Sequence, residues 1–439
     1  MHRKWRDHHR NLSWVETATS LFPLCPIEVR MTVVVLFQIS MTIIDGERCG
    51  ETLKSIFENA KNPERITVGL VEQNEPSDKF CLESYCASYG KQFTMGISCA
   101  DLYEGLDILD RKVIRNDFVK VFLKEEMAKC PHANQINPVN FFYVNAKGPI
   151  KARSIARKAL GNEEFCLQID AHTEFVPEWD EVVKEDWEKA DNEFAVLSAV
   201  PPPVSEKGAY SLGGDKHGRV PRQCKIRYRD NKFPDYESPA DGYAEGLDRP
   251  LLSHGYSGAF AFSKCHLEES APHDPFLEFA MPIDQFSRYA RFWTRGYDTY
   301  TPTQNVVIHN YDDQENGHGG NEWFKRQKDR IRKASILRVK TALQLPEGDS
   351  SPAAQSNLGI YGIGRRRSLE QLSEFTNLDL KSLRGNTLES LTCSGKGWVS
   401  YDEGISPVQN LFDNPDNLDP HPEFPRRSKL VFYKQDIQA

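Results

Sequence analysis

The chain has 439 residues, of which 39% are hydrophobic and 11% aromatic, so it can bury a large core and is too apolar for wholesale disorder. Its formal net charge of −8 argues against a general nucleic-acid-binding protein, because such a protein needs a basic surface. The ten cysteines form no CxxC pair and no compact framework, which predicts mostly free thiols, a reducing compartment and a cytoplasmic location.

The first 30 residues are basic and rich in histidine, and we expect them to form a disordered N-terminal extension. Prolines interrupt them before any continuous apolar segment typical of a secretory signal. The apolar run Met31–Ile44 has 14 residues, whereas a membrane-spanning helix needs about 20. This run therefore predicts a buried strand and no membrane span.

The next segments have the pattern of a strand, a helix and a strand. The β-branched run ends in a turn at Asp45, a helix is predicted at 51–60, and a second strand at 66–71. This order is typical of a βαβ unit and predicts a parallel sheet. We expect further strands at 140–144, 165–169, 194–200 and 305–309, and helices at 81–89, 108–129, 150–160, 180–190, 285–294, 322–343 and 369–375.

One short motif organises the remaining candidates for a site. The predicted strand 165–169 ends on Asp170 and His172, which are both good metal ligands, and ligands bind at the carboxyl edge of open α/β sheets. A divalent ion there could bridge these two side chains to a phosphate. An ordinary strand-to-helix loop is an equally good interpretation of the spacing alone. His309 ends another apolar run and is the candidate third ligand, although a lone histidine at a strand end is more often structural.

Basic residues near predicted helix starts are candidates for binding a diphosphate. Lys147 and Arg153 flank the start of the helix predicted at 150–160, where a helix N-terminus favours anions. Arg367 precedes the helix predicted at 369–375 in the same way. The alternative for each of them is a solvated basic residue on the surface.

Glycines at 251–262 alternate with aromatic residues and permit a close approach of the backbone, as an acceptor pocket requires. We assign this pocket to His254, Gly255, Tyr256 and Ser257. The segment 201–250, rich in Gly and Pro, is expected to be a long loop over the sheet edge. We therefore predict a catalytic domain over 31–345, a linker and a C-terminal segment returning to the site over 346–391, and a polar tail over 392–439.

Together these motifs resemble the family of N-acetylglucosamine (GlcNAc) transferases that modify protein hydroxyl groups. That family includes cytoplasmic enzymes acting on hydroxyproline of a ubiquitin-ligase adaptor. The resemblance covers about residues 33–380 and is carried by several short motifs: Asp45 with Cys49-Gly50, Asn62-Pro-Glu-Arg-Ile-Thr-Val-Gly, Ala146-Lys-Gly-Pro with Ala152-Arg153, Leu167-Gln-Ile-Asp-Ala-His, Arg291-Phe-Trp-Thr-Arg-Gly-Tyr-Asp, Val307-Ile-His and Tyr361-Gly-Ile-Gly.

The resemblance implies an α/β fold of the GT-A type, with a Rossmann-like, mainly parallel mixed sheet flanked by helices. It implies transfer of GlcNAc from UDP-GlcNAc to hydroxyproline or Ser/Thr of a protein, such as a ubiquitin-ligase adaptor, with retention and an α-linkage. By the same resemblance Asp170, His172 and His309 would hold Mn²⁺, and Asp284 and Asp170 would be catalytic. The donor would be bound by Thr42, Asp45, Lys147, Arg153 and Arg367.

Other readings stay open beside this one. A non-catalytic binding module of the same fold is favoured by departures from the family's pattern at Ile43, Ile44, Glu174 and Gln285. A transferase that uses another UDP-sugar fits the same motifs. A metal-dependent phosphoesterase fits less well, because a two-metal site needs a larger cluster of Asp and His ligands. Metal-dependent turnover of UDP-GlcNAc would separate a catalyst from a binding module.

Overall fold

The computed structural model describes residues 33–38, 45–74, 80–90, 130–142, 146–210, 214–223, 226–228, 233–236, 242–281, 283–311, 322–385 and 397–407. These residues all belong to one unit, Thr32–Ala439. The predicted N-terminal extension, Thr42 and the helix predicted at 108–129 lie outside the described residues.

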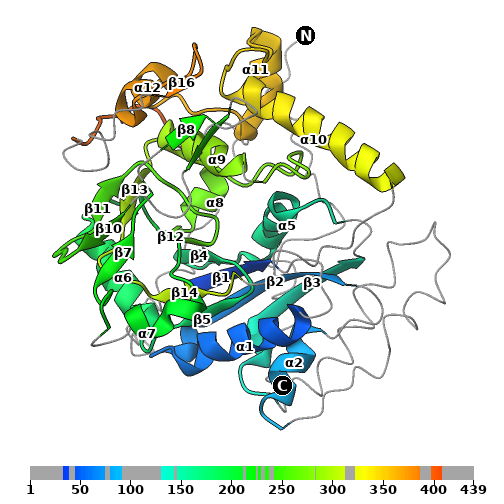
Figure 1. Ribbon diagram of the computed structural model, residues 1–439, viewed down its shortest axis with the longest axis vertical. Coiled ribbons are helices and arrows are strands. Elements are labelled where there is room, and N and C mark those ends of the chain that lie inside the picture. Colours follow the sequence, from blue (N-terminus) through cyan, green and yellow to red (C-terminus); the bar gives the residue numbers. More distant parts are fainter. Residues whose placement is uncertain are drawn as a thin grey trace, which may run out of the picture. The chain divides into compact units, whose positions relative to one another are not determined.

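An eight-stranded sheet runs through the described part of the chain in the order β11-β13-β6-β12-β4-β1-β2-β3 (Figure 1). Four of its seven neighbouring pairs are parallel, and the three antiparallel pairs all involve β11 or β12. The predicted α/β fold with a mixed, mainly parallel sheet is confirmed. The strands are β1 (Val33–Gln38), β2 (Ile66–Asn74), β3 (Ile136–Phe142), β4 (Phe165–Ile169), β6 (Ala195–Ser198), β11 (Leu251–Ser253), β12 (Phe260–Lys264) and β13 (Asp298–Thr301).

Helices cover both faces of this sheet. α1 (Asp45–Glu58) connects β1 to β2, whereas α5 (Pro149–Ala156) lies on the connection from β3 back to β4, in the opposite direction across the sheet. Right-handed crossovers in opposite directions place their helices on opposite faces. Figure 1 shows α1 and the neighbouring α2 (Cys81–Ala87) on one side of β1–β3 and α5 on the other.

A second core surrounds α9 (Asp284–Trp293). Its side chains Phe286 and Trp293 belong to one buried cluster with Val339 of α10 (Glu322–Ala342) and Leu372 of α12 (Leu369–Thr376). This packing fixes the position of the helix start. The other helices are α6 (Trp179–Lys189), α7 (Lys207–Tyr210), α8 (His266–Ser270) and α11 (Pro352–Leu358). No helix in the described ranges is both long enough and apolar enough to cross a membrane.

Several segments differ from the predicted elements. The expected long loop at 201–250 contains the short strands β7 (Arg219–Pro221), β8 (Ile226–Tyr228), β9 (Pro234–Tyr236) and β10 (Tyr243–Glu245), which pair locally. The region predicted as a linker and C-terminal segment, 346–391, contains α11 near its start, because Ser351 caps the first turn of this helix and Pro352 suits its start. Part of the predicted polar tail, residues 397–407, packs on Arg366 and Arg367, which contact the rings of Trp398 and Tyr401.

All six cysteines within the described ranges are paired, as Cys49–Cys81, Cys86–Cys130 and Cys166–Cys265. Their Cα separations of 5.2, 5.4 and 4.9 Å are those of ordinary disulfides. The prediction of mostly free thiols is therefore wrong. The partners are 32, 44 and 99 positions apart, and the fold rather than a short spacing brings them together. The predicted cytoplasmic location loses the support that it drew from free thiols.

Thiol labelling should reveal these bonds. We expect at most four reactive thiols in the denatured, non-reduced protein, because six of the ten cysteines are paired, and ten after reduction. Mass spectrometry of the labelled chain measures both values. Labelling of five or more thiols before reduction would contradict the pairing.

Candidate functional site

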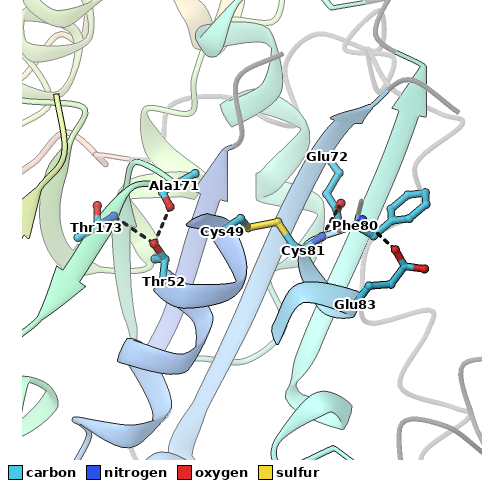
Figure 2. The surroundings of a disulfide bond; sticks show 8 residues. All are labelled: Cys49, Thr52, Glu72, Phe80, Cys81, Glu83, Ala171 and Thr173. Carbon is cyan, nitrogen blue, oxygen red and sulfur yellow. Dashed lines mark hydrogen bonds between the residues drawn. A yellow bond between two sulfur atoms is a disulfide. The ribbon is translucent and has the colours of Figure 1, made fainter. Parts of the chain in front are cut away.

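The turn that follows β4 is held in place by α1. Figure 2 shows Thr52 of α1 between two groups of this turn, with its hydroxyl donating to the Ala171 carbonyl at 2.6 Å and accepting from the Thr173 amide at 3.1 Å. The Thr173 hydroxyl in turn donates to the Asp170 carbonyl at 2.7 Å. Asp170 therefore sits in a fixed turn at the carboxyl end of β4, with its side chain 29% exposed.

A small antiparallel ribbon brings His309 to the same place. β14 (Val307–His309) pairs with β5 (Thr173–Phe175) so that His309 lies opposite Thr173. The Nε2 atom of His309 is 3.7 Å from Oδ2 of Asp170, and its ring centroid is 6.2 Å from that of His172. The structure thus brings together three residues that span 139 positions (309 − 170).

The environment of His309 favours the neutral imidazole. Burial lowers the pKa of His309, and the nearby Asp170 carboxylate opposes this only in part. Its Nδ1 atom is buried and has no hydrogen-bond partner among the described residues. A neutral imidazole is the form that binds metal ions, and the nitrogen available for this next to Asp170 is Nε2.

The arrangement fits a divalent cation by residue type and spacing. Carboxylate and imidazole ligands suit Mn²⁺ and related ions. Metal–ligand bonds of about 2.0–2.2 Å allow two ligand atoms on one ion to lie up to about 4.4 Å apart, and the separation of 3.7 Å between Asp170 and His309 is within that limit. In the described part of the chain, however, no three His, Cys, Asp or Glu side chains already converge as a metal-holding group.

Arg153 connects the turn to a second carboxylate. This arginine of α5 is 6% exposed; its Nη2 donates to Oδ1 of Asp170 at 2.9 Å, and its Nη1 is 3.8 Å from Oδ2 of Asp284. Asp284 is the first residue of α9, and neither of its oxygens has a hydrogen-bond partner within the described ranges. Burial raises the pKa of Asp284 to about 6, although Arg153 opposes this rise.

Of the other residues predicted to bind the nucleotide-sugar donor, one lies near the site and another lies away from it. Lys147 is near it, because its carbonyl accepts from the Phe279 amide at 2.6 Å in the loop that leads to Asp284. Asp45 begins α1, which follows β1. Arg367 is not brought to Asp170: its buried guanidinium pairs with Asp298 at 2.8 Å.

The predicted acceptor pocket consists of buried residues. His254, Tyr256 and Ser257 are 2%, 0% and 5% exposed, and a side chain on Gly255 would overlap the Gln223 carbonyl. An acceptor pocket needs exposed atoms, and these four residues do not provide them. They are instead interior residues, with His254 against the ring of Phe375 and Gly255 against the Gln223 backbone.

Two residues that were not predicted, Gly258 and Gln168, support the Arg153 guanidinium from below. Gly258 lies directly under the Arg153 guanidinium, since a Cβ at this position would be 2.8 Å from Cζ of Arg153. Gln168 donates to the Gly258 carbonyl at 2.7 Å. The sequence holds one signal for Gln168: it precedes Asp170 by two positions, which places both on the same face of a strand.

Comparison with known proteins identifies the class. The model of the family described as "Glycosyltransferase (GlcNAc)" matches residues 40–382, which is more than half of the chain. The protein is thus a member of a glycosyltransferase family. It belongs to this GlcNAc glycosyltransferase family, as the sequence motifs predicted. No curated protein sequence matches the chain.

Three solved structures are similar to the chain at low identity. GalNAc-T7 with UDP, GalNAc and Mn²⁺ is 13% identical with a TM-score of 0.42, over 79% of this chain and 57% of that one. S. aureus TarS 1-349 in complex with UDP-GlcNAc is 13% identical with a TM-score of 0.34, over 70% and 67%. The same TarS fragment described without that ligand is 12% identical with a TM-score of 0.33, over 75% and 80%. The chain therefore spans less than two thirds of the length of the GalNAc-T7 structure.

Proposed function

We propose that this protein transfers GlcNAc from UDP-GlcNAc to a hydroxyl group of a protein, either hydroxyproline or Ser/Thr, with retention and with a divalent cation such as Mn²⁺. The observation that carries the proposal is the group formed by Asp170, Arg153, Asp284 and His309 at the carboxyl end of β4. In a GlcNAc transferase this is the edge at which a nucleotide-sugar is expected to bind.

The proposed reaction mainly demands neutralisation of charge, because the bond from the sugar to phosphate breaks to leave a nucleoside diphosphate. Asp170, His172 and His309 would hold the cation, which supplies positive charge next to the diphosphate. Arg153 and Lys147 would add positive charge from the protein. Asp284 is 2% exposed, so it would act through the Arg153 guanidinium, which faces both carboxylates, rather than by direct contact with a sugar.

Retention can proceed by attack on the same face of the sugar, with the departing phosphate taking the proton of the acceptor hydroxyl. This route needs no strong base from the protein. It is compatible with a single carboxylate at the start of α9, where Gln285 follows Asp284.

The three disulfides bear on the compartment and so on the acceptor. Disulfides persist in oxidising compartments and are rare in the cytosol. We infer that the protein works in an oxidising compartment and that its acceptor is a polypeptide exposed there. A cytoplasmic ubiquitin-ligase adaptor fits this setting less well than a protein of the same compartment.

A screen of UDP-sugars with Mn²⁺, scored by release of UDP, tests the proposal. We expect UDP-GlcNAc to give the fastest release, and chelation of the metal to stop it. Faster release from another UDP-sugar would show that the proposed donor is wrong, while the proposed class of reaction would stand. Absence of release with every donor, despite binding of UDP, would instead favour a binding module.

His309→Ala should raise the Mn²⁺ concentration needed for half-maximal UDP release by about 10-fold or more, since loss of a metal ligand should cost at least as much as loss of a residue that supports one. Titration of free Mn²⁺ by electron paramagnetic resonance measures the same loss without turnover. The matched control is His132→Ala, because His132 stacks on Phe57 at a ring distance of 4.8 Å in another part of the fold.

The competing candidate for the third ligand is His318, which lies outside the described residues. A shift of the Mn²⁺ requirement by His318→Ala, together with no shift by His309→Ala, would show that the ligand assignment is wrong.

A further inference from the structure

Gln168 lies beneath the site in a fully buried polar network. Its side-chain oxygen faces Nη1 of Arg288 at 2.7 Å, Nε2 of His273 at 2.6 Å and the Tyr256 hydroxyl at 3.4 Å. Gln168 itself is 4% exposed, so it cannot touch a substrate. Its contacts nevertheless reach both carboxylates of the site.

The orientation of the Gln168 amide is fixed by its partners. A guanidinium can only donate hydrogen bonds, so the atom of Gln168 that faces Arg288 must be the oxygen. The amide nitrogen then points the other way and donates to the Gly258 carbonyl at 2.7 Å. The amide therefore accepts on one side and donates on the other, whereas a carboxylate can only accept.

The Gly258 end of this connection leads to Arg153. Gly258 lies in the turn that enters β12, and the absence of a side chain lets the Arg153 guanidinium lie against its backbone. That guanidinium binds Asp170 at 2.9 Å and faces Asp284 at 3.8 Å. The position of the Gly258 backbone therefore sets how deeply Arg153 sits between the two carboxylates.

The Arg288 end leads to Asp284. Arg288 is on α9, four residues and about one turn after Asp284, and it also pairs with Glu268 of α8. The Gln168–Arg288 hydrogen bond thus ties the strand that precedes Asp170 to the helix that starts on Asp284. The two hydrogen bonds of Gln168, to Gly258 and to Arg288, therefore both affect the spacing between Asp170 and Asp284.

We propose that Gln168 is a positioning residue of the transferase site, which sets the spacing of Asp170, Arg153 and Asp284 through the Gly258 turn and Arg288. The role rests on the proposed function for its effect on turnover. The geometry on which it depends is independent of the donor's identity.

Gln168→Glu tests the arm to Gly258. The glutamate carboxylate of this variant can still accept from Arg288. It cannot donate to the Gly258 carbonyl, and its second oxygen would instead face that carbonyl oxygen. We expect kcat for UDP release to fall by about 10- to 100-fold, as for a displaced catalytic group, while KM for UDP-GlcNAc changes by less than about 3-fold. Gly258→Ala pushes Arg153 directly and should give the same split between kcat and KM.

The matched control is Gln135→Glu. Gln135 also donates to backbone carbonyls, those of Pro63 and Ile66 at 2.7 and 2.6 Å, and its oxygen faces His132. It precedes β3, four strands along the sheet order from β12. This variant should lower Tm and leave kcat within about 2-fold, which separates positioning from a general loss of stability.

A combined variant gives a readout without turnover. The loss of Tm in the double variant Gln168→Glu/Gly258→Ala should be smaller than the sum of the two single losses. Both substitutions disturb the same contact, the one between the Gly258 backbone and the Arg153 guanidinium. Additive losses, or an unchanged kcat for Gln168→Glu in an active wild-type background, would overturn the inference. A wild-type protein that releases no UDP with any donor would instead refute the proposed function, and the Tm cycle would still decide the role of Gln168.

Discussion

Replacement of Asp170 by alanine should lower metal-dependent UDP release by at least about 100-fold, comparable to the loss of a group that stabilises charge in a transition state. Asp170 is the residue on which the site converges, since it binds Arg153 and faces His309. Its side chain lies at the sheet edge and is 29% exposed, so the fold should survive. Circular dichroism and initial rates of UDP release measure both expectations.

Two further variants make this result specific. Asp170→Asn keeps an oxygen for Arg153 and removes the charge, and it should be as inactive as alanine but closer to wild type in Tm. Asp180→Ala removes a structural carboxylate, whose oxygens accept from the Lys61 and Asn62 amides at 2.7 and 2.9 Å. It should lose stability and retain turnover. Unchanged UDP release in Asp170→Ala would remove the central assignment of the site.

Asp284→Asn should lower turnover by about 100-fold or more and at the same time stabilise the protein at neutral pH. The turnover loss follows from removing the negative charge that faces Arg153 at 3.8 Å and so helps to set the position and charge of the site. The gain in stability follows from its pKa, which burial raises from 3.8 to about 6. Ionising Asp284 therefore costs the folded state more than the unfolded one.

The sign of the pH dependence follows from the same shift. Below about pH 4 the carboxyl group is protonated in both states and has no effect on the free energy of unfolding. Between about pH 4 and pH 6 the unfolded chain ionises first, so this free energy falls as pH rises. Above about pH 6 the loss is complete at about 3 kcal/mol, since one pKa unit corresponds to about 1.4 kcal/mol.

Urea unfolding at pH 4, 5, 6 and 8 measures this difference between wild type and Asp284→Asn. The variant should gain stability over wild type with rising pH and reach a plateau above about pH 6. Asp180→Asn is the contrasting control, because the Asp180 carboxylate accepts from the Lys61 and Asn62 amides at 2.7 and 2.9 Å and its loss should destabilise the fold. A variant Asp284→Asn that is less stable than wild type at pH 8 would show that burial does not make the ionised carboxylate costly at this position.

The sequence predicts the central part of the sheet because its signals there are local. The alternation at 165–169 becomes β4 at the same residues, and the β-branched runs at 33–44 and 66–71 become β1 and β2. β13 was missed because Asp298-Thr-Tyr-Thr has no apolar run, although all four of its residues are buried by neighbouring elements. Burial of such a strand depends on tertiary packing, which periodicity does not contain.

The site shows the same division between local and distant information. Asp170 and His172 are evident as a motif, and His309 as the polar end of an apolar run, so their residue types indicate a metal site. Arg367 has the same kind of local signal and lies elsewhere, because Asp298 offers it a buried partner that no spacing reveals. The roles of Gly258 and Gln168 likewise depend on backbone contacts between distant segments.

The residues of the site come from two segments that are far apart in the sequence, 153–172 and 284–309, so they are synthesised at different times. Arg153, Asp170 and His172 precede β6, whereas Asp284 and His309 are made more than 80 residues after that strand, which ends at Ser198 (284 − 198 = 86). A nascent chain can therefore form the Arg153–Asp170 pair long before it contains either Asp284 or His309. The site is completed only when β14 leaves the ribosome and pairs with β5. Ribosome-bound fragments that end before β14 lack His309 and should thus bind Mn²⁺ more weakly than the complete chain, however well their first strands have folded.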